Sequence, residues 1–482
     1  MKKAICLILS LIMIMSFATS FSASIVDLGD MGSTNDQASG DEATKNEATF
    51  DTSVPDNYAK SGKCGDNARW YYYDDEKTLI ISGVGATETD SSNTGAAYSS
   101  LPFTKAVVKE GITELDDYAF AYCKSLEEIS LPDTLETLNS FMFSGCEKLK
   151  SVTIPKNVSF IGVMMFDECY ALEELIVDPE NKEFDSRDNC NAIVHTQTNC
   201  LRVAIRTSTF AETVTAIGGG SYTGAPGIVE IVMPDTITDI FGDPFMGCDE
   251  LETVVLSTSL KAVGISDFAD CTSLKNVTIP NGIERIEPYA FLRCTSLEKI
   301  SIPASVKGIA QSAFSECTAL KEIEFKSGIE EIGNFAFAHC TSLENVTFPA
   351  TIKEIGPHAF RDCTSLKTIS IYNKDCEISD YAETIPEDTV IYGFEGSKAE
   401  AYAKKYKREF KILTEPEYIL GDVDLDGVIT VVDATKIQHY IAKLTTLADI
   451  QKECADVTKD GQVTVHDATK IQFYVAKKIT EF

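Results

Sequence analysis

The fold is decided by residues 294–317, which read Cys-Thr-Ser-Leu-Glu-Lys-Ile-Ser-Ile-Pro-Ala-Ser-Val-Lys-Gly-Ile-Ala-Gln-Ser-Ala-Phe-Ser-Glu-Cys. The two cysteines stand 23 residues apart, and this spacing joins nine cysteines with one longer interval: Cys123, Cys146, Cys169, Cys248, Cys271, Cys294, Cys317, Cys340 and Cys363. Each has Phe three positions before it and Leu three positions after it, with further apolar residues eight before, six after and eight after. Five aligned columns at one period indicate a repeated structural unit.

The long interval fits the same template with an insertion. Residues 222–234 match it with Ala225 in the cysteine column, and the 56 residues from Cys169 to Ala225 are two periods plus ten. This predicts one irregular coil around residues 179–211. A period of about 20–29 residues with Leu-x-x-Ile-x-Ile strands is typical of a leucine-rich-repeat solenoid. We therefore expect about eleven coils over residues 104–378, each with a β-strand and a short helix or turn.

The repeat motif, Cys-Thr-Ser-Leu-x-x-Ile-x-Ile-Pro followed by Ile-x-x-Ile-Gly-x-x-Ala-Phe, resembles the BspA-like leucine-rich repeat of bacterial surface proteins. The resemblance covers residues 104–378. Flanking segments resemble the caps of that family, namely a β-rich N-terminal cap at 56–103, with a hairpin at 60–85, and a C-terminal cap at 379–412. The resemblance implies a surface or secreted protein used for adhesion or ligand contact, with no catalytic residues.

The N-terminus has the composition of an export signal. Residues 1–23 combine Lys2 and Lys3, a short apolar run and small residues, as secretory signal peptides do. The apolar run, about 15 residues, is too short to span a bilayer comfortably, which disfavours a transmembrane anchor. Residues 24–55 are rich in Ser, Thr and acidic residues, which predicts a disordered linker. We expect a secreted protein that does not insert into the membrane after signal removal.

The repeat cysteines lie between inward-facing Phe and Leu positions, and free cysteine is a commonly buried small side chain. Because Ala225 replaces cysteine in one coil, we expect buried free thiols rather than a ladder of disulfides. The sequence has no CxxC pair or Cys/His cluster of the kind that binds metals. Cys190 and Cys200 lie off the 23-residue spacing, within the irregular coil, and a disulfide between them stays open.

One face of the predicted sheet is small and mostly polar. The residue seven positions after each repeat cysteine should point away from the core, because side chains alternate along a strand. Solenoids often present such a face to partners, although a merely solvated face remains the alternative. The candidate ligand residues are Ser130, Thr153, Thr278, Ser301, Glu324, Thr347 and Ser370. The lone Trp70 lies in the cap, so this face lacks the aromatic platform common in sugar binding.

The C-terminal residues contain two loop–helix segments that align at an offset of 34 residues. Calcium is bound by about six to eight hard oxygens, and a twelve-residue loop offers them at positions 1, 3, 5, 7 and 12, with Gly at position 6. The predicted ligands are Asp422, Asp424, Asp426, the carbonyl of Val428 and Asp433 in the first loop, and Asp456, Thr458, Asp460, the carbonyl of Gln462 and Asp467 in the second. Because Thr458 supplies a neutral hydroxyl, we expect the second of these two Ca²⁺ sites to be weaker.

These loops end in Asp and the sequence shows no evident entering helix, unlike that of an ordinary EF-hand. The pair resembles a type I dockerin over residues 421–482, behind a linker at 413–420. The resemblance implies calcium-dependent folding and docking onto a cohesin module of a scaffoldin, in a cellulosome or at a cell surface. By the family pattern, the cohesin contacts are Val431, Val432, Gln438, His439, Lys443, Val465, His466, Gln472, Phe473 and Lys477. The two copies are similar at these positions, and docking in either of two orientations stays open.

The whole chain has 482 residues, and 42 basic against 74 acidic residues give a formal net charge of −32. This charge disfavours nucleic acid and anionic membranes as partners. Signal, linker, repeats, caps and dockerin leave no stretch of about 150 residues for a catalytic domain. We predict a secreted, non-catalytic adaptor whose repeat face binds protein or glycan, linked to polysaccharide degradation. The alternative is a dockerin-borne hydrolase subunit acting on plant polysaccharide.

Overall fold

The computed structural model describes residues 54–88, 96–413, 419–447, 449–458 and 461–481. The expected signal peptide at 1–23, and the expected linker at 24–55 apart from its last two residues, lie outside the described residues. No helix in the described part of the chain is both long and apolar enough to cross a lipid bilayer. The solenoid with its caps and the C-terminal helical unit are described in turn.

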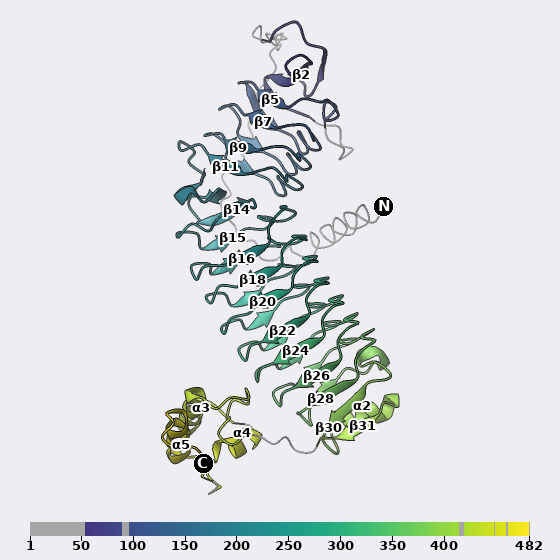
Figure 1. Ribbon diagram of the computed structural model, residues 1–482, viewed down its shortest axis with the longest axis vertical. Coiled ribbons are helices and arrows are strands. Elements are labelled where there is room, and N and C mark those ends of the chain that lie inside the picture. Colours follow the sequence, from purple (N-terminus) through teal and green to yellow (C-terminus); the bar gives the residue numbers. More distant parts are fainter. Residues whose placement is uncertain (1–53, 89–95, 414–418, 448, 459–460, 482) are drawn as a thin grey trace, which may run out of the picture. The chain divides into compact units, whose positions relative to one another are not determined.

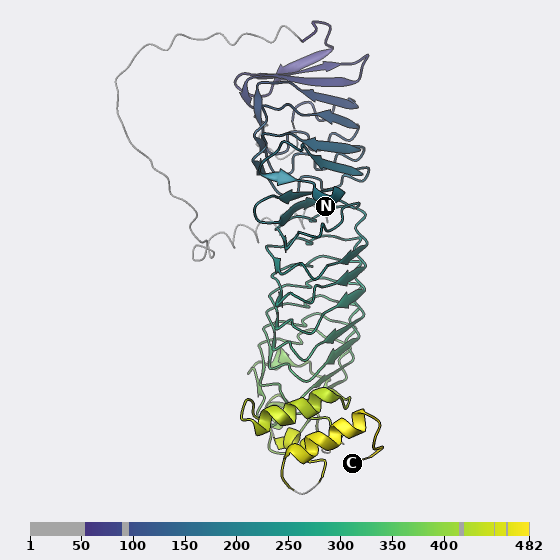
Figure 2. The same ribbon diagram turned by 90° about the vertical axis from the view of Figure 1, so that its left-hand side faces the viewer.

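The solenoid carries two rows of parallel strands, and each regular coil contributes one strand to each row (Figures 1 and 2). Neighbouring strands are one repeat apart, so that Lys299 pairs with Glu322 and Glu331 pairs with Glu354. The long-strand row comprises β3 (Thr78–Gly83), β5 (Lys105–Val108), β7 (Glu128–Ser130), β9 (Ser151–Ile154), β11 (Glu174–Val177), β16 (Glu230–Val232), β18 (Thr253–Val255), β20 (Asn276–Thr278), β22 (Lys299–Ile302), β24 (Glu322–Phe325), β26 (Asn345–Phe348), β28 (Thr368–Ile371), β30 (Val390–Gly393) and β31 (Phe410–Ile412).

The short-strand row repeats on the same period. It comprises β4 (Gly85–Ala86), β6 (Ile112–Leu115), β8 (Thr137–Leu138), β10 (Phe160–Ile161), β15 (Ala216–Ile217), β17 (Asp239–Ile240), β19 (Ala262–Val263), β21 (Arg285–Ile286), β23 (Gly308–Ile309), β25 (Glu331–Ile332), β27 (Glu354–Ile355) and β29 (Glu377–Ile378). Each row also divides between β17 and β19 or between β20 and β22, but the larger interruption lies between β10 or β11 and the strands that follow residue 199. The interruption coincides with the predicted irregular coil.

The solenoid has about 14 turns, more than the eleven expected from the cysteine spacing. The additional turns come from the caps. β3 pairs in parallel with β5, and β30 pairs in parallel with β28, so both cap segments continue the long-strand row. The antiparallel strands β1 (Lys60–Lys63) and β2 (Ala68–Tyr73) precede β3. The cap sequences depart from the repeat template, but their backbones still form the hydrogen bonds of solenoid coils. The number of coils expected from the sequence was therefore too low.

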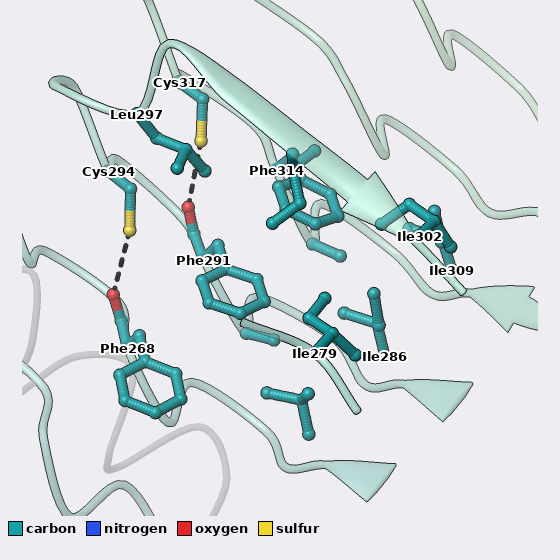
Figure 3. Packing of buried hydrophobic residues seen from close by; sticks show 14 of the residues in the cluster. Phe268, Ile279, Ile286, Phe291, Cys294, Leu297, Ile302, Ile309, Phe314 and Cys317 are labelled. Atoms are coloured by element: carbon teal, nitrogen blue, oxygen red, sulfur yellow. Dashed lines mark hydrogen bonds between the residues drawn. The ribbon is translucent and has the colours of Figure 1, made fainter. Parts of the chain in front are cut away.

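The core is built of rings stacked from coil to coil (Figure 3). Phe268, Phe291 and Phe314 are fully buried, with successive ring centroids 5.4 and 5.1 Å apart and planes within 12° of parallel. Every repeat thiol after Cys123 also donates a hydrogen bond to a carbonyl of the preceding coil: Cys294 Sγ donates to the carbonyl of Phe268 over 3.2 Å, and Cys317 Sγ to that of Phe291 over 3.1 Å. The repeat cysteines are buried and free, as predicted.

An inserted hairpin forms the irregular coil. Its elements are β12 (Phe184–Asp185), the 3₁₀ turn η1 (Arg187–Asn189), β13 (Ala192–His195) and β14 (Cys200–Ala204). Side chains of the insertion accept hydrogen bonds from backbone amides of β11, the last strand of the preceding long-strand sheet. The amide of Leu175 donates to Asn191 Oδ1 over 2.6 Å, and the amide of Val177 donates to Ser186 Oγ over 3.0 Å. β14 then pairs in parallel with β15 and restarts the short-strand row.

The structure has Cys190 and Cys200 as free thiols and not as a disulfide. The hairpin register gives the reason. Cys200 pairs with His195 beside the turn, whereas Ala192 pairs with Ala204 at the open end, and Cys190 lies before β13 at that open end. The two cysteines therefore lie at opposite ends of the hairpin, although they flank it in the sequence.

Asp267 is a carboxylate inside the core. It stands four positions before Cys271, in a column where the following coils have alanine. Its side chain is fully buried, Oδ2 accepts the amide of Gly264 over 2.6 Å, and Oδ1 has no hydrogen-bond partner among the described residues. Burial raises the pKa of Asp267 to about 7.

The wild-type protein should lose stability as the pH rises, because Asp267 must ionise inside the core, and the Asp267→Asn variant should not show this loss. The folded protein keeps a proton on Asp267 that the unfolded chain releases near pH 4, so the free energy of unfolding falls as the pH rises from about 4 to about 7. At pH values above this window the variant should gain roughly 3–4 kcal/mol over the wild type, relative to their difference at about pH 4, since each pKa unit corresponds to about 1.4 kcal/mol. Urea unfolding of both proteins at both ends of the window measures this gain. A stability difference that does not change with pH would contradict the prediction.

The C-terminal cap ends the solenoid with the 3₁₀ turn η2 (Ala382–Thr384) and the helix α2 (Lys398–Tyr406). Ser397 caps this helix by accepting the amide of Glu400 over 3.1 Å. Ala399, Tyr402 and Ala403 of α2 are buried and join the hydrophobic core of the coils. The helix thus covers apolar surface that a further coil would otherwise cover.

The C-terminal helical unit consists of α3 (Val431–Ile441), α4 (Asp449–Ala455) and α5 (Val465–Val475). Its small core includes Ala434 and Ile437 from α3 and the matching Ala468 and Ile471 from α5. Gln451 Nε2 of α4 donates to the carbonyl of Val423 over 3.1 Å. The internal repeat of the sequence is therefore also a repeat of the packing.

Candidate functional site

The first loop gathers three carboxylates in front of α3. Asp422, Asp424 and Asp426 each place one carboxylate oxygen within 4.8 Å of the others. Asp422 also shapes the loop, because its Oδ2 accepts the amide of Gly427 over 2.8 Å and its Oδ1 that of Asp426 over 3.0 Å. Gly427 has a φ of 86°, a conformation that glycine adopts without steric cost. This arrangement offers clustered hard oxygens of the kind that calcium prefers.

The protonation behaviour of these carboxylates fits a cation site. Burial, followed by the neighbouring charges of Asp433 and Asp426, raises the pKa of Asp424 to about 7. Burial also raises the pKa of Asp422. A divalent cation among these oxygens would compensate both the lost hydration and the mutual repulsion. The donor set therefore fits calcium.

The predicted twelfth ligands close each loop onto its helix. Asp433 Oδ2 accepts the amide of Thr430 over 2.8 Å, and Asp467 Oδ2 accepts the amide of Thr464 over 2.8 Å. Each threonine hydroxyl in turn accepts an amide of the first helical turn, which completes a capping box at both helices. Both aspartates are fully buried. They fix the direction in which each helix leaves its loop.

The second loop repeats this geometry with one chemical difference. Asp456 Oδ2 accepts the amide of Gly461 over 2.7 Å. Thr458 Oγ1 lies 2.9 Å from Asp467 Oδ1 and 3.3 Å from Asp456 Oδ1, so a hydroxyl stands where the first loop has a carboxylate. Asp460, the third predicted side-chain ligand, lies outside the described residues. The predicted carbonyl donors belong to the exposed residues Val428 and Gln462.

All ten predicted cohesin contacts are exposed, on α3 and α5 or just beyond their ends: Val431, Val432, Gln438, His439, Lys443, Val465, His466, Gln472, Phe473 and Lys477. The valines that begin the two helices, Val431 and Val465, are 57% and 59% exposed. Leu444, which was not predicted, is 75% exposed directly after Lys443. The internal repeat concealed it, because the second copy has Lys478 at this position.

The candidate ligand face of the solenoid is divided between exposed and half-buried side chains. Ser130, Thr153, Thr278, Ser301 and Thr347 are exposed, whereas Glu324 and Ser370 are half-buried. Ser301 Oγ lies 3.0 Å from Glu324 Oε2, and Lys326 Nζ lies 2.7 Å from Glu324 Oε1. This face therefore carries its own polar contacts between coils.

The solenoid and the C-terminal helical unit each match a known protein family. Residues 93–200, 198–307 and 284–383 match the BspA type leucine-rich repeat region. The chain belongs to this family. Residues 420–476 of this BspA-type protein match the dockerin type I domain. Neither match covers a catalytic domain.

Several solved structures are similar to this BspA-type protein. A leucine-rich repeat protein from Bacteroides ovatus is 19% identical, covers 72% of this chain and 99% of its own, and has a TM-score of 0.42. A leucine-rich cell surface protein from Faecalibacterium prausnitzii is 22% identical, with 55% and 94% covered and a TM-score of 0.35. The pneumococcal vaccine antigen PcpA is 18% identical, with 73% and 100% covered and a TM-score of 0.41. No curated protein matches the chain significantly.

Proposed function

We propose that this protein is a secreted, non-catalytic adaptor that docks onto a cohesin module of a scaffoldin through residues 421–482. The duplicated site supports the proposal: each copy has a glycine turn, a capping box and an exposed apolar residue at the helix start. Val431 in the first copy and Val465 in the second provide equivalent apolar contacts. Dockerin type I domains in general bind calcium and cohesins, and residues 420–476 match this domain.

Two calcium ions complete the docking unit in this proposal. Asp422, Asp424, Asp426 and Asp433 hold the first ion with the Val428 carbonyl. The second ion is held by Asp456, Thr458, Asp460, Asp467 and the Gln462 carbonyl. Each ion joins a loop to the start of its helix, because the same carboxylates accept loop amides and amides of the helix cap.

The solenoid is the presenting part of the adaptor. After removal of residues 1–23, the protein is attached to a cellulosome or cell surface through its cohesin partner. Its long-strand face then binds a protein or glycan in a setting of polysaccharide degradation. The exposed, small and polar residues of that face support this assignment, as solenoids offer such surfaces to partners.

Cohesin capture by the full chain tests the proposal. The protein should bind at least one of a panel of immobilised cohesin modules in calcium, and binding should be lost in EDTA. Val431→Asp and Val465→Asp place a charge at the start of α3 and α5. If the helices dock in either orientation, each single variant should retain capture, and the double variant should lose it by about 100-fold or more. Capture that is equal in EDTA, or unaffected by the double variant, contradicts the proposed docking.

A further inference from the structure

A cavity opens on the short-strand row at the irregular coil. Its volume is about 560 Å³, within the usual range for small-molecule sites. It lies where β10 ends one short-strand sheet and the hairpin strands β12, β13 and β14 begin the next. Cys200 and Ala216, neighbours in the register of β14 and β15, contribute small side chains to its lining. We refer to this cavity as the hairpin cleft.

Two phenylalanine side chains line the hairpin cleft and are largely exposed to solvent. Phe160 is 53% exposed and Phe241 is 55% exposed. Phe241 stands seven positions before its repeat cysteine, where the other coils have small or polar residues, such as Ala310, Glu287 and Gly333. Neither ring is therefore required by the repeat template, and leaving this much apolar surface in water is unfavourable. An occupant of the cleft would cover both rings.

Arg202 supplies an uncompensated positive charge in the same cleft. It is half-buried and forms no ion pair with a carboxylate in the part of the chain that the structure describes. A Cβ atom added at Gly218 would lie 3.2 Å from Nη1 of Arg202, so the guanidinium rests against this glycine. In contrast, five other arginines lie within 3.5 Å of a carboxylate oxygen: Arg187, Arg206, Arg285, Arg293 and Arg361.

The remaining polar groups of the cleft suit a ligand with several hydroxyl groups. Thr198 and Thr215 offer hydroxyls, and His195 Nδ1 lies 2.8 Å from Thr198 Oγ1. Asp239 also lines the cleft, and its Oδ2 accepts the hydroxyl of Thr238 over 2.7 Å. A sugar ring presents C–H groups to an aromatic face and hydroxyls at its edge, and a guanidinium binds a carboxylate through two parallel hydrogen bonds.

We propose that the hairpin cleft binds an acidic oligosaccharide, with a sugar carboxylate on Arg202 and sugar faces against Phe160 and Phe241. An extended peptide with a free carboxylate is the competing occupant. Its backbone would have to pair with one of the edge strands β10 and β12, and each of these is only two residues long. So short an edge offers few main-chain hydrogen bonds for strand addition. The sugar therefore fits the observed groups better.

Calorimetric titration of the full chain tests this assignment. The probes are a galacturonic acid trisaccharide, its methyl ester, sialyllactose and a short peptide with a free C-terminal carboxylate. At least one acidic sugar should bind, which identifies uronic or sialic acid as the source. When the uronic probe binds, its methyl ester should bind about tenfold or more weakly. Equal binding of the ester, binding of the peptide alone, or no binding of either acidic sugar would overturn the proposal.

Matched variants separate the cleft from a general charge effect. Arg202→Gln should weaken binding of the acidic sugar by about tenfold or more, whereas Arg285→Gln, on the same strand row, should leave it unchanged. Phe241→Ala should weaken binding of the acidic sugar, whereas Phe241→Tyr, which keeps an aromatic ring, should bind it as the wild type does. Asp422→Ala should have no effect, so this result is independent of cohesin docking. An equal loss in the two arginine variants, or no loss in Phe241→Ala, would contradict the assignment.

Discussion

Replacing Asp422 and Asp456 together with alanine is expected to abolish cohesin capture, with a loss of about 100-fold or more. Each aspartate has two tasks in its loop. Its carboxylate is a predicted calcium ligand, and the same group accepts the amide of the turn glycine over 2.8 or 2.7 Å. Without it, the loop loses both the ion and the hydrogen bonds that shape the turn. Biolayer interferometry against the captured cohesin measures the loss.

Glu453→Ala provides the matched control for this experiment. Glu453 is an exposed acidic residue of α4, so its removal changes the charge of the same unit by one without touching either loop. This variant should bind cohesin as the wild type does. Retention of capture by the Asp422 and Asp456 double variant, or an equal loss in Glu453→Ala, would show that the loops do not support docking.

The single variants should reveal an unequal pair of sites. In the first loop Asp424 provides a carboxylate, whereas in the second Thr458 provides a hydroxyl that hydrogen-bonds to Asp467. Fewer negative charges around the ion lower calcium affinity. Calcium titration of Asp422→Ala should therefore retain only the weaker event, and Asp456→Ala only the stronger one.

Truncation of Phe291 to alanine is expected to destabilise the solenoid by about 3–5 kcal/mol. The ring is fully buried and stacks against Phe268 on one side and Phe314 on the other. Its loss removes two ring contacts and leaves a cavity between coils. Because each coil is held mainly by its neighbours, the same change should broaden the unfolding transition or divide it in two.

Phe160→Ala is the control for this core substitution. It deletes the same side chain from a position where the ring is 53% exposed, so the expected cost is roughly 1 kcal/mol or less. Guanidinium unfolding followed by circular dichroism compares the two variants. A loss in Phe291→Ala no larger than in Phe160→Ala would mean that the stacked rings do not hold the coils together.

Much of the fold was predictable because one buried environment recurs in coil after coil. The columns that contain Phe291 and Cys294 predicted both the coil spacing and the buried thiols. The predicted count of about eleven coils was slightly lower than the observed count of about 14, since the cap strands β3 and β30 pair with the solenoid although their sequences leave the template. Backbone hydrogen bonds tolerate many side chains, so strand pairing extends further than the motif.

The candidate sites differ in how much of each could be predicted from the sequence. The calcium loops are local: Asp422, Asp424 and Asp426 stand two residues apart, and one turn brings their oxygens together. The hairpin cleft is not local, because Phe160, Arg202 and Phe241 come from three separate segments. One signal was available, as Phe241 is an aromatic residue in a column that otherwise contains Gly, Ala, Asn, Asp and Glu. Its spatial neighbours could not be read from that departure.

The sequence by itself therefore determined the repeat, the inward columns and the two acidic loops, since contacts at a fixed short spacing recur wherever the pattern recurs. The tertiary structure decided how the irregular coil is built. It placed Cys190 and Cys200 at opposite ends of a hairpin and left β10 and β12 as separate sheet edges. The physical reason is that the inserted residues have no matching segment in the next coil with which to pair. Their path therefore depends on which backbone amides of β11 donate hydrogen bonds to their side chains.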